Sequence, residues 1–146
     1  MVIEEEILIN APLDKVWKTF TDLTCWVNWN SVLKDVSTEH EYIQKGETFS
    51  CSLRPFIFPV HFETFIEEVA LHERVVWSGS KYGIFARHEF IFEKIEDSVR
   101  VTSRETFKGI TMENMKLIFP AWRIRELTKS LLTDLKEASE NVKIRI

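Results

Sequence analysis

Apolar and polar residues alternate through much of the middle of the chain, a pattern typical of β-strands that bury one face. The alternation predicts strands over residues 60–69, 73–78, 85–95 and 99–107, and a first strand over residues 4–9. Short turns at residues 81–83 and 96–98 separate successive strands. Because strands joined by short turns pair in opposite directions, these segments predict an antiparallel meander.

Residues 31–59 follow a less regular pattern. Residues 39–43 and 48–53 predict a hairpin about Gly46, since glycine favours tight turns. Residues 31–38 have enough apolar positions for one short strand. The segment 56–58 lies between Pro55 and Pro59, and flanking prolines favour a loop or a sheet edge over a central strand.

Two regions have the spacing of helices. Pro12 suits the first turn of a helix, and apolar residues then recur at steps of three and four along one face. We expect a break near Asp22, followed by a second short helix. A long helix is predicted from Pro120, with the apolar stripe Ile124, Leu127, Leu131, Leu135, Ala138 and Val142. Residues 112–119 are apolar and fit no single period.

These elements together predict the fold class. A length of 146 residues indicates one domain, residues 1–146, and a hydrophobic content of 45% is enough for a core. We expect an α+β fold in which a curved antiparallel sheet of about six to seven strands wraps around the long C-terminal helix. Two short helices follow the first strand. A fold of this kind can hold a small apolar molecule between the sheet and the long helix.

Charge and cysteine content narrow the function classes. The formal net charge of −4 argues against a nucleic-acid partner, and no segment is long and apolar enough for membrane insertion. The N-terminus lacks the basic and apolar regions of a signal peptide, so a cytoplasmic protein is the default interpretation. Cys25 and Cys51 have no metal-type spacing, and two cysteines in an aromatic-rich domain are more often buried thiols than a disulfide, which is the alternative. We therefore expect no metal and no cofactor.

Three sequence strings resemble a known superfamily. "INAPLDKVWKTFTD" and the following "WVNWNS" are similar to the opening of the START-like, or Bet v 1-like, helix-grip proteins (SRPBCC), where a Pro-started helix carries a Val-Trp pair. "RHEFIFEKIEDSVRVTSRETFKG" is similar to the last hairpin of that fold. The resemblance covers nearly the whole chain and is nearest to the polyketide cyclase/dehydrase-like branch. It implies a cavity between sheet and long helix.

The resemblance and the strand faces together suggest which residues line such a cavity. A void lined with large apolar side chains is the usual setting for an apolar ligand, whereas a filled aromatic core is the alternative. The candidate ligand-binding residues are Trp17, Trp26, Trp29, Val60, Phe62, Trp77, Phe90, Phe92, Ser103, Phe119, Trp122 and Ile124. Core packing is the stronger interpretation for Trp17, and closing the short helices onto the sheet is an alternative for Trp26 and Trp29.

His88, Ser103 and Glu105 are the candidate chemistry, because strand parity places all three on the predicted concave face. A three-residue turn at 96–98 pairs opposite faces of the two strands, so a one-residue shift or a bulge is needed to bring His88 near Glu105. A buried His-Glu pair suits general acid/base catalysis, and a structural hydrogen bond is the alternative. No nucleophile elbow accompanies Ser103.

Three functions follow from these features. The first is binding of a small hydrophobic or amphipathic molecule in the cavity. The second is a polyketide cyclase- or dehydratase-like enzyme that uses His88 and Glu105 as acid and base. The third is a protein-interaction module that uses an apolar patch on the outer face of the sheet, as the resemblance to co-chaperone relatives implies. The sequence is compatible with a monomer or a homodimer.

Overall fold

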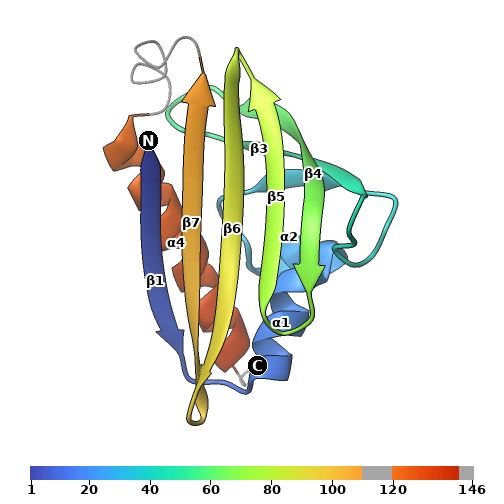
Figure 1. Ribbon diagram of the computed structural model, residues 1–146, viewed down its shortest axis with the longest axis vertical. Coiled ribbons are helices and arrows are strands. Elements are labelled where there is room, and N and C mark those ends of the chain that lie inside the picture. The colour runs from blue at the N-terminus through green and yellow to red at the C-terminus, as the bar shows by residue number, and fades with distance from the viewer. Residues whose placement is uncertain (110–119, 142–146) are drawn as a thin grey trace.

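The computed structural model describes residues 1–109 and 120–141. Within those residues, seven strands form one antiparallel sheet in the order β1-β7-β6-β5-β4-β3-β2 (Figure 1). The strands are β1 (Val2–Ile9), β2 (Lys34–Ser37), β3 (Thr48–Leu53), β4 (Val60–Ala70), β5 (Arg74–Lys81), β6 (Ile84–Ile95) and β7 (Ser98–Gly109). The predicted meander is therefore confirmed from β4 to β7.

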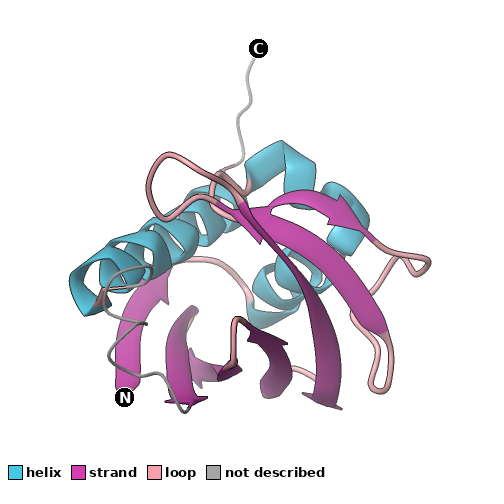
Figure 2. Ribbon diagram, turned by 90° about the horizontal axis from the view of Figure 1, so that it is seen from above, coloured by secondary structure: helices cyan, strands magenta, loops and turns pink. Residues whose placement is uncertain are grey.

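The helices lie on the concave side of the sheet. They are α1 (Leu13–Thr21), the short 3₁₀ helix η1 (Leu23–Cys25), α2 (Trp26–Trp29) and α4 (Ala121–Glu140). Figure 2 shows the sheet curling beneath α4, which is 20 residues long and therefore spans about 30 Å. This is the predicted α+β arrangement, with short helices after the first strand and a long helix gripped by the sheet.

The predicted helix break at Asp22 is confirmed and has a local cause. Asp22 has an extended backbone, and its carboxylate accepts a hydrogen bond from the backbone N–H of Thr24 at 3.0 Å. Such a side-chain cap satisfies a free donor at the start of η1. The Nε1–H group of Trp26 donates to the carbonyl of Phe20 at 2.8 Å, which ties α2 back to the end of α1.

The turn between β6 and β7 sets the register of the site, and it differs from the three-residue turn predicted at 96–98. Only Glu96 and Asp97 form the turn, because Ile95 already pairs with Ser98. Glu96 has a φ of 56°, the left-handed backbone that two-residue hairpin turns require. The one-residue shift is therefore present without a bulge, and it places His88 directly opposite Glu105.

The predicted hairpin of residues 39–43 with 48–53 is wrong. β3 pairs instead with β2, through Lys34 with Ser52 and Ser37 with Ser50. Residues 39–43 join the end of α1: the backbone N–H of Leu23 donates to the carbonyl of Glu41, and that of Ile43 donates to the carbonyl of Thr21. These hydrogen bonds and the burial of Ile43 stabilise residues 39–43 in place of the predicted strand pairing. Gly46, with a φ of 86°, still turns the chain.

An aromatic cluster fills the end of the sheet that α1 and α2 cover. Phe20 is its centre: its ring lies 4.7 Å from that of Phe90, 5.8 Å from that of Trp77 and 5.9 Å from that of Trp26. α4 contributes Leu131, Leu132 and Leu135 to the same core; Leu131 and Leu135 confirm the middle of the predicted stripe, and Leu132 was not part of it. Val142 and residues 112–119 lie outside the described residues.

Candidate functional site

A cavity lies between the concave face of the sheet and the first turns of α4. Its volume is about 110 Å³. The apolar residues in its wall are Leu53, Val60, Phe62, Trp77, Ile84, Ala86, Phe107 and Ile124, and the polar ones are Thr64, Ser78, Ser80, Lys81, His88 and Glu105. Lys81 and Ser80 are exposed, so the cavity reaches the surface beside the β5–β6 hairpin. It is a mainly apolar chamber with one buried polar corner.

A second cavity of about 70 Å³ adjoins the first and runs deeper beneath α4. The two share seven lining residues, among them Trp77, His88 and Glu105. The deeper part adds Phe49, Cys51 and several α4 side chains to the wall. The polar corner therefore stands at the junction of an outer and an inner chamber.

His88, Ser103 and Glu105 form that polar corner. Nε2 of His88 lies 2.6 Å from Oγ of Ser103, within hydrogen-bond distance. Nδ1 of His88 lies 3.6 Å from Oε2 of Glu105, too far for a hydrogen bond. The His88 ring stacks on Phe90 at a centroid distance of 4.1 Å and meets Trp77 edge to face, which accounts for its burial. Among the described residues, the Glu105 carboxyl has no hydrogen-bond partner.

Burial shifts the pKa values of His88 and Glu105 in opposite directions. It lowers the pKa of His88 to about 3 and raises the pKa of Glu105 to about 7, because a charge is costly where water is excluded. Near neutral pH the imidazole is therefore uncharged, and the carboxyl is close to half-protonated. The corner then offers both hydrogen-bond donors and acceptors to a molecule in the cavity while carrying little charge.

The order of the three side chains is that of a nucleophile, a base and an orienting acid, but Ser103 is badly placed for attack. Its side chain is fully buried and is not part of the cavity wall. A nucleophile must reach a substrate carbonyl, and the base must be within hydrogen-bond distance of its own orienting group. Ser103 instead anchors the His88 ring, leaving His88 and Glu105 as the groups that face the cavity.

Most of the predicted ligand-binding residues fall into two groups. Val60, Phe62, Trp77 and Ile124 line the cavity together with His88 and Glu105. The residues packed in the aromatic cluster, away from the wall of either chamber, are Trp17, Trp26, Trp29, Phe90 and Phe92. Trp122 is largely exposed at the start of α4, and Phe119 lies outside the described residues.

Several lining residues were not among the predicted site residues. Thr64 and Phe107 follow the same strand alternation as the predicted residues, so parity was a sufficient signal for them. Ile84 and Ala86 share the parity of His88 on β6, and Leu53 shares that of Cys51 on β3, so alternation indicated their face but not that they lie over the first turn of α4. Sheet curvature is a tertiary property that alternation does not report.

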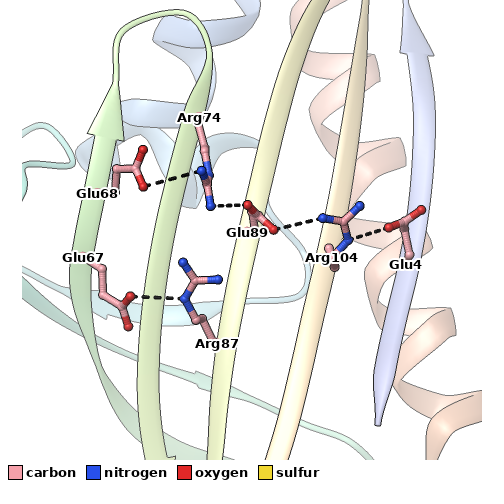
Figure 3. Close-up of polar contacts among 7 residues, drawn as sticks. All are labelled: Glu4, Glu67, Glu68, Arg74, Arg87, Glu89 and Arg104. Atoms are coloured by element: carbon pink, nitrogen blue, oxygen red, sulfur yellow. Dashed lines mark hydrogen bonds and ion pairs between the residues drawn. The ribbon is translucent and has the colours of Figure 1, made fainter.

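The outer face of the sheet carries a ladder of charges (Figure 3). Arg104 Nε bonds Glu4 at 2.7 Å, and Arg104 Nη1 reaches Glu89 at 3.3 Å. Glu89 also pairs with Arg74, which lies 3.7 Å from Glu68. The ladder crosses five strands of the outer face. A protein-interaction module of the kind predicted above would need an apolar patch on that face. Arg104 therefore lies on the outer face of the sheet, away from the cavity.

Two further kinds of site can be checked in the described part of the chain. No group of three or more His, Cys, Asp and Glu side chains there has an arrangement that could hold a metal ion. No helix in residues 1–109 or 120–141 is both long and apolar enough to cross a membrane.

Comparisons with known proteins place this geometry in a wider group. No curated protein matches the sequence. Among solved structures, a hypothetical protein from Helicobacter pylori is similar with a TM-score of 0.79 and 18% identity over 96% of this chain and 88% of the other. Norcoclaurine synthase from Thalictrum flavum gives 0.78 and 12% over 98% and 95%. The di-domain ARO/CYC protein BexL from the BE-7585A biosynthetic pathway gives 0.75 and 16% over 96% and 46%.

These identities are low, so the structural likeness supports the helix-grip fold alone. The sequence adds a family assignment, since the family described as polyketide cyclase / dehydrase and lipid transport matches residues 1–140. That match includes the described residues around the cavity and both strands that carry His88 and Glu105. The chain belongs to the polyketide cyclase / dehydrase and lipid transport family.

Proposed function

We propose that this protein binds a small, mainly apolar molecule that carries a hydroxyl or carbonyl group, in the cavity between the sheet and α4. One observation supports this most directly. The Glu105 carboxyl faces an apolar cavity and has no hydrogen-bond partner among the described residues. The Glu105 side chain is only 19% exposed, so its carboxyl is largely removed from water, and a ligand hydroxyl or carbonyl would supply the hydrogen bond that it lacks.

The dimensions of the cavity limit the ligand. An apolar cavity of about 150 Å³ is known to admit benzene. The outer chamber is about 110 Å³ and continues into an inner one of about 70 Å³. This space suits one aromatic ring or two fused rings, with any longer substituent directed toward the opening beside Lys81.

The charge of the corner limits the ligand further. With the pKa of His88 near 3 and that of Glu105 near 7, the corner carries at most a partial negative charge at neutral pH. An anionic group placed beside Glu105 would be repelled in this low-dielectric setting. We therefore favour a neutral phenol, enol or ketone over a carboxylate or a phosphate at this position.

A titration with 2-naphthol, followed by its own fluorescence, tests the proposal. We expect saturable binding, and weaker binding of naphthalene, which lacks the hydroxyl. Ala86→Leu places three extra carbons in the outer chamber and should weaken 2-naphthol binding at least about tenfold, or about 1.4 kcal/mol. Ala70→Leu at the end of β4, outside both chambers, is the matched control and should bind as the wild type does. Equal binding by the two variants would contradict the proposal.

Acid/base catalysis on an enolisable ketone is a second candidate, and the raised pKa of Glu105 favours it. A group whose pKa lies near the working pH is the best compromise between holding and releasing a proton. Glu105 would remove a proton next to the carbonyl, and neutral His88 would stand beside the enol oxygen as a hydrogen-bond partner. The name of the family includes cyclases and dehydrases, whose chemistry involves such steps.

Deuterium exchange distinguishes catalysis from binding alone. In heavy water, the protein should accelerate the loss of the C1 proton signal of 2-tetralone, whose enol resembles 2-naphthol. Glu105→Gln keeps the shape of the side chain and should abolish the acceleration while retaining 2-naphthol binding. If the wild type leaves the uncatalysed exchange rate unchanged but binds 2-naphthol, the binding function alone stands.

A further inference from the structure

The loop between β3 and β4 exposes a group of large apolar side chains. Phe56, Ile57 and Phe58 are 47%, 75% and 78% exposed, and Trp122 in the first turn of α4 is 59% exposed. The Phe56 and Trp122 rings lie 5.8 Å apart, so the loop and the helix form one continuous surface. Contiguous exposed apolar surface of this kind marks an interaction site more often than scattered single residues do.

Two arginines hold the loop in position. Nη1 of Arg54 donates to the carbonyl of Ile57 at 2.8 Å. Nε of Arg123 donates to the carbonyl of Pro55, and its Nη2 donates to the carbonyl of Arg54 at 3.4 Å. Because these bonds satisfy backbone carbonyls of the loop, its apolar side chains are left pointing away from the polar contacts. The exposure is thus built into the loop conformation.

The apolar group lies at the mouth of the ligand cavity. Leu53 and Val60, on either side of the loop, both line the outer chamber, as does Ile124 in the same helical turn as Trp122. The β5–β6 hairpin at the same end adds Lys81 to the cavity wall and the exposed ring of Tyr82 beside it. Three separate segments therefore bring aromatic and basic side chains to one end of the molecule.

We propose that this end docks onto a lipid bilayer that contains anionic headgroups, with Ile57 and Phe58 entering the interface. Trp and Tyr, here Trp122 and Tyr82, favour the boundary between headgroups and hydrocarbon. Within the described residues no carboxylate lies at ion-pair distance from Arg54 or Lys81, so both cations can meet lipid phosphates.

A second copy of the chain fits this surface less well. A two-fold contact between identical patches would bring the Arg54 and Lys81 side chains of both copies toward one another. Like charges brought together at an interface are unfavourable, whereas an anionic bilayer neutralises them. Docking at the cavity mouth would also let an apolar ligand pass between bilayer and protein with little contact with water. This last point rests on the proposed binding function, but the docking itself does not.

Sedimentation with lipid vesicles tests the proposal. The wild type should bind vesicles of equal parts phosphatidylcholine and phosphatidylglycerol more strongly than vesicles of phosphatidylcholine alone. Ile57→Ser should weaken binding at least about tenfold, or about 1.4 kcal/mol. The matched control is Leu71→Ser, since Leu71 is 68% exposed in the turn at the other end of β4 and should have no effect. Phe58→Ser repeats the test if Ile57→Ser alters the circular dichroism spectrum.

Three results would overturn the proposal. They are no binding of the wild type to anionic vesicles, an equal loss in Ile57→Ser and Leu71→Ser, and a wild-type dimer in gel filtration that Ile57→Ser converts to a monomer. Titration with 2-naphthol separates docking from cavity binding. If Ile57→Ser loses vesicle binding but keeps 2-naphthol binding, the two functions are distinct. If the wild type binds vesicles and not 2-naphthol, the docking surface stands and the cavity function fails.

Discussion

Glu105→Gln gives the most direct test of the electrostatics of the cavity. The pKa of Glu105 is raised from 4.5 to about 7 in the folded protein. A raised carboxyl pKa means that the folded state holds its proton more tightly than the unfolded chain does. Its contribution to stability is therefore fully present below pH 4.5 and is lost as the pH rises to about 7. Each pKa unit corresponds to about 1.36 kcal/mol, so the loss is about 3 kcal/mol.

His88 acts in the opposite direction over an overlapping range. Its pKa is lowered from 6.5 to about 3, so the unfolded state gains the proton first as the pH falls. The contribution of His88 is present above pH 6.5 and is lost toward pH 3. The two effects oppose one another between pH 4.5 and 6.5, and the wild-type curve alone would conceal both. The informative quantity is the difference in unfolding free energy between Glu105→Gln and the wild type.

Urea unfolding, followed by circular dichroism at a series of pH values, measures that difference. Relative to the wild type, Glu105→Gln should gain about 3 kcal/mol between pH 4.5 and pH 8, because glutamine cannot ionise. Glu63→Gln, on an exposed position of β4, is the control and should follow the wild-type curve within about 0.5 kcal/mol. Parallel curves for Glu105→Gln and the wild type would refute the interpretation of Glu105 as a buried, easily protonated acid.

Three more substitutions test the scaffold by urea unfolding. Gly79→Ala should cost about 1–3 kcal/mol, since its Cβ would lie 2.8 Å from the carbonyl oxygen of Glu63; an unchanged midpoint would contradict this close approach. Trp26→Phe should cost about 1–3 kcal/mol by removing the bond to the Phe20 carbonyl and leaving a gap. Glu89→Gln should destabilise by about 1–3 kcal/mol in low salt and by less in molar salt, because its two arginine partners lose their shared carboxylate.

The sequence was most informative where a local rule determines the structure. Alternation along β6 and β7 correctly placed His88 and Glu105 on the concave face, because successive side chains of a strand point to opposite sides. The exact pairing was less accessible. It depends on whether Ser98 belongs to the turn or to the strand, and that depends on Glu96 taking a left-handed backbone. Glutamate has no strong preference for that conformation, so the residue type did not predict the two-residue turn.

Sorting the aromatic residues needed information that periodicity does not contain. Helical spacing showed that Trp17 and Phe20 share a face, and strand parity showed that Trp77 and Phe90 do as well. Whether such a residue meets the cavity or another ring depends on how far α4 lies from each part of the curved sheet. Only Trp77 of these four reaches the cavity, since Trp17 and Phe20 belong to α1 and Phe90 packs against the Phe20 ring. That distance is set by long-range packing.

The register between β6 and β7 decides which side chains lie on each face of the sheet at the site. His88 pairs with Glu105 on the concave side, and the next pair, Glu89 with Arg104, belongs to the ladder on the outer side (Figure 3). A slip of one residue would exchange these faces and bury the Arg104 charge in the cavity. The ladder of ion pairs therefore disfavours the shifted register. It thereby maintains the 3.6 Å distance between Nδ1 of His88 and Oε2 of Glu105. Fixed strands can hold an acid that lacks a hydrogen bond in an apolar cavity, where a flexible segment would relax to bring it to water.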